Sequence, residues 1–127
     1  MFELTINNEI YQFNFGMGFM REINKVVKTP VEGVKGLDQH IGLRYKVGGL
    51  MDGDVEVLVE VLEIANKGQN PRITRPGLDE YIDNPETDID ALFAEVLDFL
   101  SKSNATKKTV AQMMELAEAE KAKAAKK

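Results

Sequence analysis

The side chains that could support covalent catalysis are few and lie far apart in the sequence. His40 is the only histidine, and the serines considered with it, Ser101 and Ser103, belong to a different predicted element. A serine nucleophile needs a base within hydrogen-bonding distance, and this spacing does not indicate one. The chain contains no cysteine, which excludes a thiol nucleophile, a thiolate metal site and a disulfide. We therefore interpret His40 as an ordinary loop residue.

Acidic side chains concentrate between residues 79 and 90, where carboxylates could bind a hard cation such as Ca²⁺. The segment lacks the glycine at position six and the terminal glutamate of an EF-hand loop. Asp88 and Asp90 lie at the expected start of a helix, where the helix dipole stabilises negative charge. We interpret these residues as helix caps and a solvated face rather than a metal site. They are Asp79, Glu80, Asp83, Glu86, Asp88 and Asp90.

A phosphate-binding loop is also poorly supported. Gly16 and Gly18 follow a predicted strand, but Arg21 stands where a dinucleotide-binding fingerprint has its third glycine. Only one strand-turn-helix unit is present. The sequence therefore predicts a scaffold or binding module without a cofactor, a metal or catalytic activity.

Length and composition indicate one domain that is stabilised by packing. The chain has 127 residues, of which 43% are hydrophobic, enough for a core. No apolar run approaches the roughly 20 residues of a membrane span, and the N-terminal residues show no signal-peptide pattern. We expect the protein to stay in the cytoplasm where it is made, without a membrane partner.

The charge distribution argues against nucleic acid as a partner. The net charge of −5 repels phosphate backbones, so binding would require a local basic patch. The only such patch is at the C-terminal end, where Glu118 and Glu120 partly neutralise it and no aromatic residue is interleaved for base stacking. Its basic residues are Lys121, Lys123, Lys126 and Lys127.

The N-terminal residues predict a β-hairpin followed by a short helix. Apolar residues alternate over 2–6 and again over 11–15, and Asn7 and Asn8 between them tolerate the positive φ of a tight turn. Apolar residues then recur at helical spacing from Met17, and we expect that helix to run to Lys28. Thr29 to Gly36 contains a proline and two glycines and is expected to be an exposed loop.

Two helices are predicted in the centre of the chain. In the first, around 43–51, Gly48 and Gly49 each cost about 1 kcal/mol relative to alanine, which indicates close packing or a bend. Gly53 ends it, and Asp54 can cap the next helix. That helix, 55–65, is apolar around nearly its whole circumference. It is either central in the domain or shared with another subunit.

Three further helices follow. Thr74 with Pro76 marks the start of a short one, which stops before Pro85. Thr87 and Asp90 match a capping box, and the apolar residues over 89–100 then repeat as one amphipathic stripe, which predicts a core helix ending near Lys102. A last helix carries apolar residues as far as Ala117.

Together these elements predict a mainly α fold. It has an N-terminal β-hairpin, a bundle of about five or six helices, and a projecting C-terminal helix. We assign residues 1–117 to a single globular domain and residues 118–127 to a fraying helical tail rich in alanine, lysine and glutamate.

Three segments in this order resemble tail assembly chaperones of long-tailed phages and prophages of Gram-positive bacteria. They are FELTINNEIYQFNFGMGFMREIN (2–24), GLMDGDVEVLVEVLEIA (49–65) and RPGLDEYIDNPETDIDALFAEVLDFLSKSNATKKTV (75–110). The resemblance implies a mainly helical protein that coats the long tape measure protein and helps recruit tail tube subunits. It also implies a longer form, made by ribosomal frameshifting, whose extension engages the tube protein. Such a chaperone acts in the host cell cytoplasm and is not retained in the virion.

Two sets of residues are candidates for the contacts that this role requires. A chaperone of a long client needs contacts between its own copies, as a ring or a spiral, and exchangeable apolar surface for the client. Methionines suit a binding surface but also fill ordinary cores. We assign subunit contacts to Val55, Leu58, Val59 and Leu62, and client contacts to Val110, Met113, Met114 and Leu116.

Two other classes of protein compete with this interpretation. The first is a structural virion protein, such as a tail or head-completion component of similar size. The second is a small DNA-binding regulator, which would need a basic recognition helix. The helices predicted over 54–100 are acidic or neutral, so the regulator is disfavoured.

Overall fold

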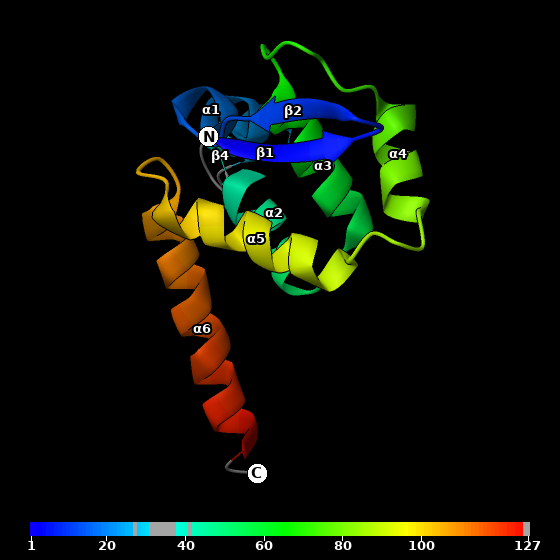
Figure 1. Cartoon of the computed structure of the whole chain (residues 1–127). Coiled ribbons are helices and arrows are strands. Elements are labelled where there is room, and N and C mark those ends of the chain that lie inside the picture. Colours follow the sequence, from blue (N-terminus) through cyan, green and yellow to red (C-terminus); the bar gives the residue numbers. More distant parts are fainter. Residues whose placement is uncertain (27, 31–37, 41, 126–127) are drawn as a thin grey trace.

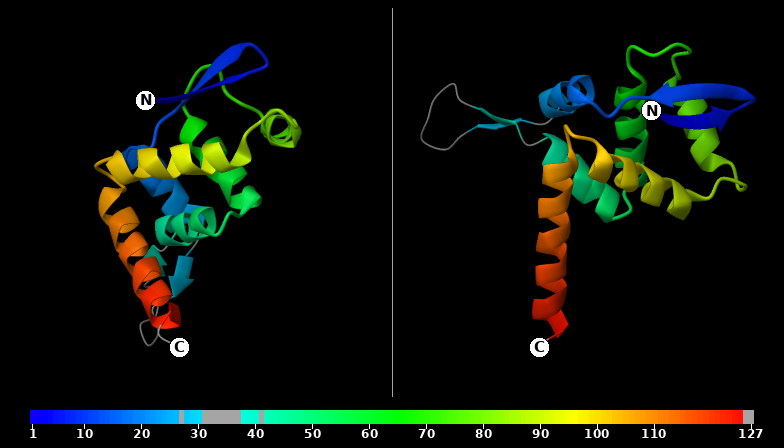
Figure 2. Two further views of the ribbon diagram at one scale, coloured as in Figure 1. Left: turned by 60° about the horizontal axis from the view of Figure 1, so that its bottom comes forward. Right: turned by 60° about the vertical axis from the view of Figure 1, so that its left-hand side comes forward.

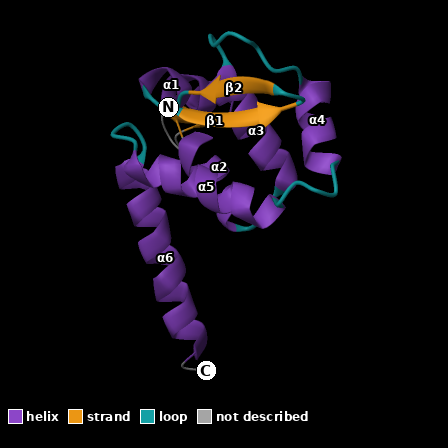
Figure 3. Cartoon of the chain, in the orientation of Figure 1, coloured by secondary structure: helices purple, strands orange, loops and turns teal. Residues whose placement is uncertain are grey.

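In the residues that the structure describes, the chain forms an N-terminal β-hairpin and six helices (Figures 1 and 3), as the sequence predicts, and a second short ribbon. The computed structural model describes residues 1–26, 28–30, 38–40 and 42–125. The hairpin strands are β1 (Phe2–Ile6) and β2 (Glu9–Phe13). The helices are α1 (Met17–Val26), α2 (Gly42–Met51), α3 (Val55–Asn66), α4 (Arg75–Asp83), α5 (Ile89–Lys102) and α6 (Lys107–Ala125).

The N-terminal hairpin forms as predicted because its turn residues accept a left-handed backbone. Asn7 and Asn8 have φ values of 51° and 66°, and the strands pair antiparallel with Phe2 opposite Phe13. Positive φ at both central residues is the requirement of a type I′ hairpin turn. One face of the hairpin, including Leu4 and Ile6, is buried against the helices.

The predicted boundary between α1 and the following loop is wrong. The helix ends at Val26 rather than Lys28, and β3 (Lys28–Pro30) pairs antiparallel with β4 (Asp38–His40). Thr29 and Pro30 therefore belong to a strand; residues 31–36 of the expected loop lie outside the described residues. Backbone groups can pair whatever the side chains are. Strands this short and polar show no alternation of apolar and polar residues, so the sequence does not reveal them. This second ribbon extends away from the helices (Figure 2).

Helix α3 lies at the centre of the fold, packed against α1, α2, α4 and β2. Its side chains are buried around most of the circumference, and Leu58, Val61 and Leu62 are fully buried. Burying so much apolar surface is the main stabilising contribution that this helix makes. The continuous apolar pattern of 55–65 is thus used largely inside one chain.

The last residue of α3, Asn66, joins three segments through its carboxamide. Its Nδ2 donates to the carbonyl oxygens of Gln12 (2.9 Å) and Pro71 (3.3 Å). Its Oδ1 accepts from the backbone N–H of Ile73 (2.7 Å) and from Arg72 Nη1 (3.0 Å). Asn66 is fully buried, so these bonds replace the water that the carboxamide loses.

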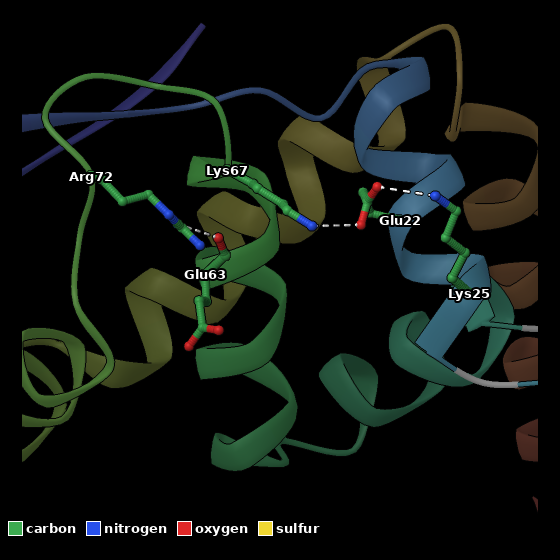
Figure 4. A network of polar contacts seen from close by, with 5 residues as sticks. All are labelled: Glu22, Lys25, Glu63, Lys67 and Arg72. Carbon is green, nitrogen blue, oxygen red and sulfur yellow. Dashed lines mark hydrogen bonds and ion pairs between the residues drawn. The ribbon is translucent and has the colours of Figure 1, made fainter.

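Charged side chains add a surface link between α1 and the end of α3 (Figure 4). Glu22 accepts from Lys67 Nζ at 2.8 Å and from Lys25 Nζ at 3.3 Å. The hydrogen bond from Lys67, and then that from Lys25, lower the pKa of Glu22. Arg72 Nη1 donates to the carbonyl oxygen of Glu63 at 2.8 Å. Exposed pairs of this kind contribute little stability, so their effect is mainly on orientation.

The helix starts confirm two predicted caps and correct a third. Asp54 accepts from the N–H groups of α3's first turn, and Thr74 accepts from the N–H of Gly77 at 3.1 Å. The capping box of Thr87 and Asp90 is wrong. Asp88 caps α5 by accepting from the N–H of Ala91 at 3.0 Å, while Thr87 Oγ1 donates to the carbonyl oxygen of Tyr81 at 2.7 Å. The end of α4 engages Thr87, which leaves the helix start to the neighbouring aspartate.

The two adjacent glycines of α2 face different neighbours. A Cβ on Gly49 would lie 2.7 Å from Cγ2 of Val57, so the backbone of α2 approaches α3 closely. A Cβ on Gly48 would lie 3.4 Å from Cε of Met113, which is an ordinary contact. Only Gly49 is therefore required by packing.

We predict opposite effects for alanine at these two positions. Gly48→Ala should leave stability unchanged or raise it by up to about 1 kcal/mol, because alanine favours the helix. Gly49→Ala should lower it by about 1–3 kcal/mol, because the stiff Val57 side chain must move. Urea unfolding of both variants measures the difference. Equal effects would contradict the close approach of α2 and α3.

Candidate partner-binding surfaces

Helix α6 packs on the body only through its first turns and then projects from it (Figures 1 and 2). Val110 is buried, and Met113 is half-buried next to Gly48 of α2. Met114 and Leu116 are 39% and 58% exposed. The four predicted client-binding residues therefore divide into an inner pair that holds α6 in place and an outer pair that solvent reaches.

Leu116 lies between two hollows where α6 runs beside α2. Arg44 Nη2 donates to Gln112 Oε1 at 3.0 Å and links the two helices at the surface here. One hollow is lined by Arg44, Gln112, Glu115, Leu116 and Ala119, and the other by Gly48, Met51, Asp52, Met113, Leu116, Ala117 and Glu120. We call these residues, with Met114, the α2–α6 surface. An apolar ridge between hollows is a shape that the side chains of a partner helix can fit.

The predicted subunit-contact residues occupy two different environments. Leu58 and Leu62 are fully buried in the core, and Val59 is 6% exposed. Val55, in the first turn of α3, is 40% exposed. Val55 and Val59 line an open groove between α3 and α4, which we call the α3–α4 groove. Its lining residues are Val55, Glu56, Val59, Arg75, Asp79, Ile82 and Asp83.

The α3–α4 groove combines an apolar floor with an acidic rim. Glu56, Asp79 and Asp83 are exposed, and Arg75 is the one basic residue of the lining. Arg75 already forms an ion pair with Glu63, and this hydrogen bond raises the pKa of the guanidinium. The rim therefore keeps a negative potential that would favour a basic partner.

A third apolar area lies beside the hairpin, and the sequence pattern did not predict it. Phe99 of α5 packs edge-on against Phe2, with ring centroids 4.9 Å apart, and remains 37% exposed. It lines a hollow together with Met1, Phe13 and Phe15. Phe99 falls outside the apolar stripe of its helix. An aromatic residue next to that stripe is the sequence feature that could have indicated this apolar area.

The residues considered for catalysis are engaged elsewhere. Ser101 Oγ donates to the carbonyl oxygen of Asp98 at 2.6 Å, and Ser103 Oγ donates to that of Phe15 at 2.7 Å. His40 belongs to β4, and its side chain lies outside the described part of the structure. Across residues 1–26, 28–30, 38–40 and 42–125, no cluster of three or more His, Asp or Glu side chains could hold a metal ion. Within the same residues no helix has the length and apolar character of a membrane span.

Comparison with known proteins identifies a family. A family model described as phage tail assembly chaperone protein, TAC, matches residues 3–115, which is most of the chain. No curated protein and no solved structure matches the chain.

We predict that aspartate has opposite consequences for folding on the inner and outer sides of α6. Val110→Asp should destabilise the protein by several kcal/mol, on the order of 3 or more, because it buries an unpaired charge. Leu116→Asp should change the unfolding free energy by less than about 0.5 kcal/mol. Urea unfolding tests both. A large loss with Leu116→Asp would mean that Leu116 belongs to the core.

Proposed function

The chain belongs to the family of phage tail assembly chaperones, and on this premise we propose that it binds the tape measure protein and helps recruit tail tube subunits around it. The family match over residues 3–115 carries this proposal. The α2–α6 surface supports it, because Met114 and Leu116 are exposed there and are not part of the buried core. This activity is binding without catalysis.

The α2–α6 surface suits the apolar face of a client helix. Leu116 supplies a ridge, and Met114 supplies a flexible, polarizable side chain that adapts to different partners. An amphipathic helix that lies beside α6 would cover the two hollows and remove its own apolar stripe from water. A long client covered in this way would be protected from aggregation until tube subunits replace the chaperone.

Many copies along one client imply contacts between copies. We propose that the chain self-associates as a ring or a spiral, with Val55 and Val59 at the subunit contact and Leu58 and Leu62 holding that part of α3 in place. A contact between two different surfaces can repeat along a client, whereas a two-fold contact stops at a dimer.

The remaining features of the proposal follow the resemblance to long-tailed phage chaperones. A longer form made by ribosomal frameshifting would carry the extension that engages the tail tube protein. Assembly would take place in the host cell cytoplasm.

Binding to the tape measure protein is tested by a pull-down with two aspartates on the outer side of α6. We expect Met114→Asp with Leu116→Asp to reduce capture at least tenfold, because both charges would be buried against an apolar helix. Lys108→Asp is the matched control, since it lies on the exposed start of α6 and changes the net charge by the same amount. Unchanged capture by the double variant would rule out this surface.

The rival function is a structural tail or head-completion component. We predict that mass spectrometry of purified phage particles finds the tail tube protein but not this chain. Its presence at a fixed copy number per particle would support the structural function instead.

A further inference from the structure

We propose that the α3–α4 groove of one copy receives the lysine-rich end of α6 from a second copy. The inference rests on the proposed self-association and names the segment that would occupy the groove. It also gives a role to the acidic residues that α4 contributes to the groove and to the basic tail.

The groove offers both apolar contact and an excess of negative charge, with three acidic residues and one basic residue in its lining. Val55 is 40% exposed at its floor, next to the half-buried Ile82. Asp79 and Asp83 stand four residues apart on α4, where two like charges on one helix face repel each other. Arg75 attracts Asp79 but is also paired with Glu63, so it relieves only part of this repulsion. A cation from outside the chain would reduce this repulsion further.

The end of α6 has the complementary character. Lys121 and Lys123 are exposed on it, and the sequence from 121 to 127, KAKAAKK, contains no acid. The alanines let a second helix approach closely, while the lysine stems can lie over apolar residues such as Val55 with their ammonium groups at the acidic rim. The chain as a whole carries a net charge of −5, so copies repel except where this tail is presented.

The arrangement in space directs this contact to a second copy. The three views in Figures 1 and 2 place the free end of α6 and the α3–α4 pair at separate ends of the molecule. The tail therefore cannot reach its own groove. A contact between these two different surfaces joins copies head to tail, and each added copy presents a new free groove and a new free tail.

The contact is tested by reversing the charges of the groove and of the tail in separate variants of the whole chain. Light scattering measures the mass of each assembly. One variant carries Asp79→Lys with Asp83→Lys, and the other carries Lys121→Glu with Lys123→Glu. Each alone should shift the mass of the wild-type assembly toward the 14.2 kDa monomer. All four changes in one chain should restore assembly, because the complementary pairs are recreated with opposite sign. Raising the salt from about 0.05 to 0.5 M should weaken assembly, since it screens exposed charges.

Matched controls separate this contact from a general effect of charge. Glu80→Lys with Glu86→Lys makes the same change beside the groove, and Lys107→Glu with Lys108→Glu makes it at the other end of α6. Neither should alter the mass. Circular dichroism establishes that every variant is folded, which we expect because all eight positions are exposed.

The outcomes distinguish this inference from the proposed function. A monomeric wild-type chain would overturn both the inference and the proposed self-association, while tape measure capture would still stand or fall by the pull-down. The inference alone would be overturned if the assembly resisted both charge reversals. It would also be overturned if the variant with all four changes failed to assemble. Loss of assembly with the groove variant but not the tail variant would also overturn it, and would point to a different basic occupant.

Discussion

The buried carboxamide of Asn66 is the contact on which the arrangement of this fold depends. It satisfies backbone groups of β2 and of residues 71–73 from the last position of α3. Leaving one such buried group without a partner costs about 1–3 kcal/mol, so the end of α3 is held against the hairpin and the chain that leads to α4. In the described part of the chain every buried side-chain nitrogen and oxygen has a hydrogen-bond partner. Fixing this one point orients α3 and hence the helices around it.

A central α3 explains why the surfaces available to partners lie at the margins of the molecule. With Leu58 and Leu62 inside the core, the most exposed apolar side chain of α3 is Val55 of its first turn, which lines the groove with α4. Likewise, Val110 anchors α6 and leaves Met114 and Leu116 outside. Met114 and Leu116 of α6 therefore lie outside the buried core and are open to a partner. Such a division suits a chaperone, because a partner can bind and leave without unfolding it.

Local signals in the sequence predicted the hairpin and most helix starts correctly. Asn7 and Asn8 suffice for the turn, and Asp54 and Thr74 suffice for two caps, because each of these effects involves only residues close in the chain. The errors arose where one element meets its neighbour in the chain, which the pattern within a single element does not reveal. Thr87 matched a capping box, but its hydroxyl donates to Tyr81 of α4, and Asp88 caps the helix instead. The β3–β4 ribbon has no side-chain alternation and was not predicted.

The sequence by itself determined the class of fold and the absence of any cysteine chemistry, because periodicity and composition are properties of the chain alone. The family also follows from the sequence, since its model matches residues 3–115 directly. Only the tertiary structure decided which apolar residues remain available to partners. Val55 and Leu58 are equivalent in the apolar pattern of α3, yet one is 40% exposed and the other fully buried. Burial depends on which elements pack against each face, and that is set by long-range contacts such as those of Asn66 rather than by helical spacing.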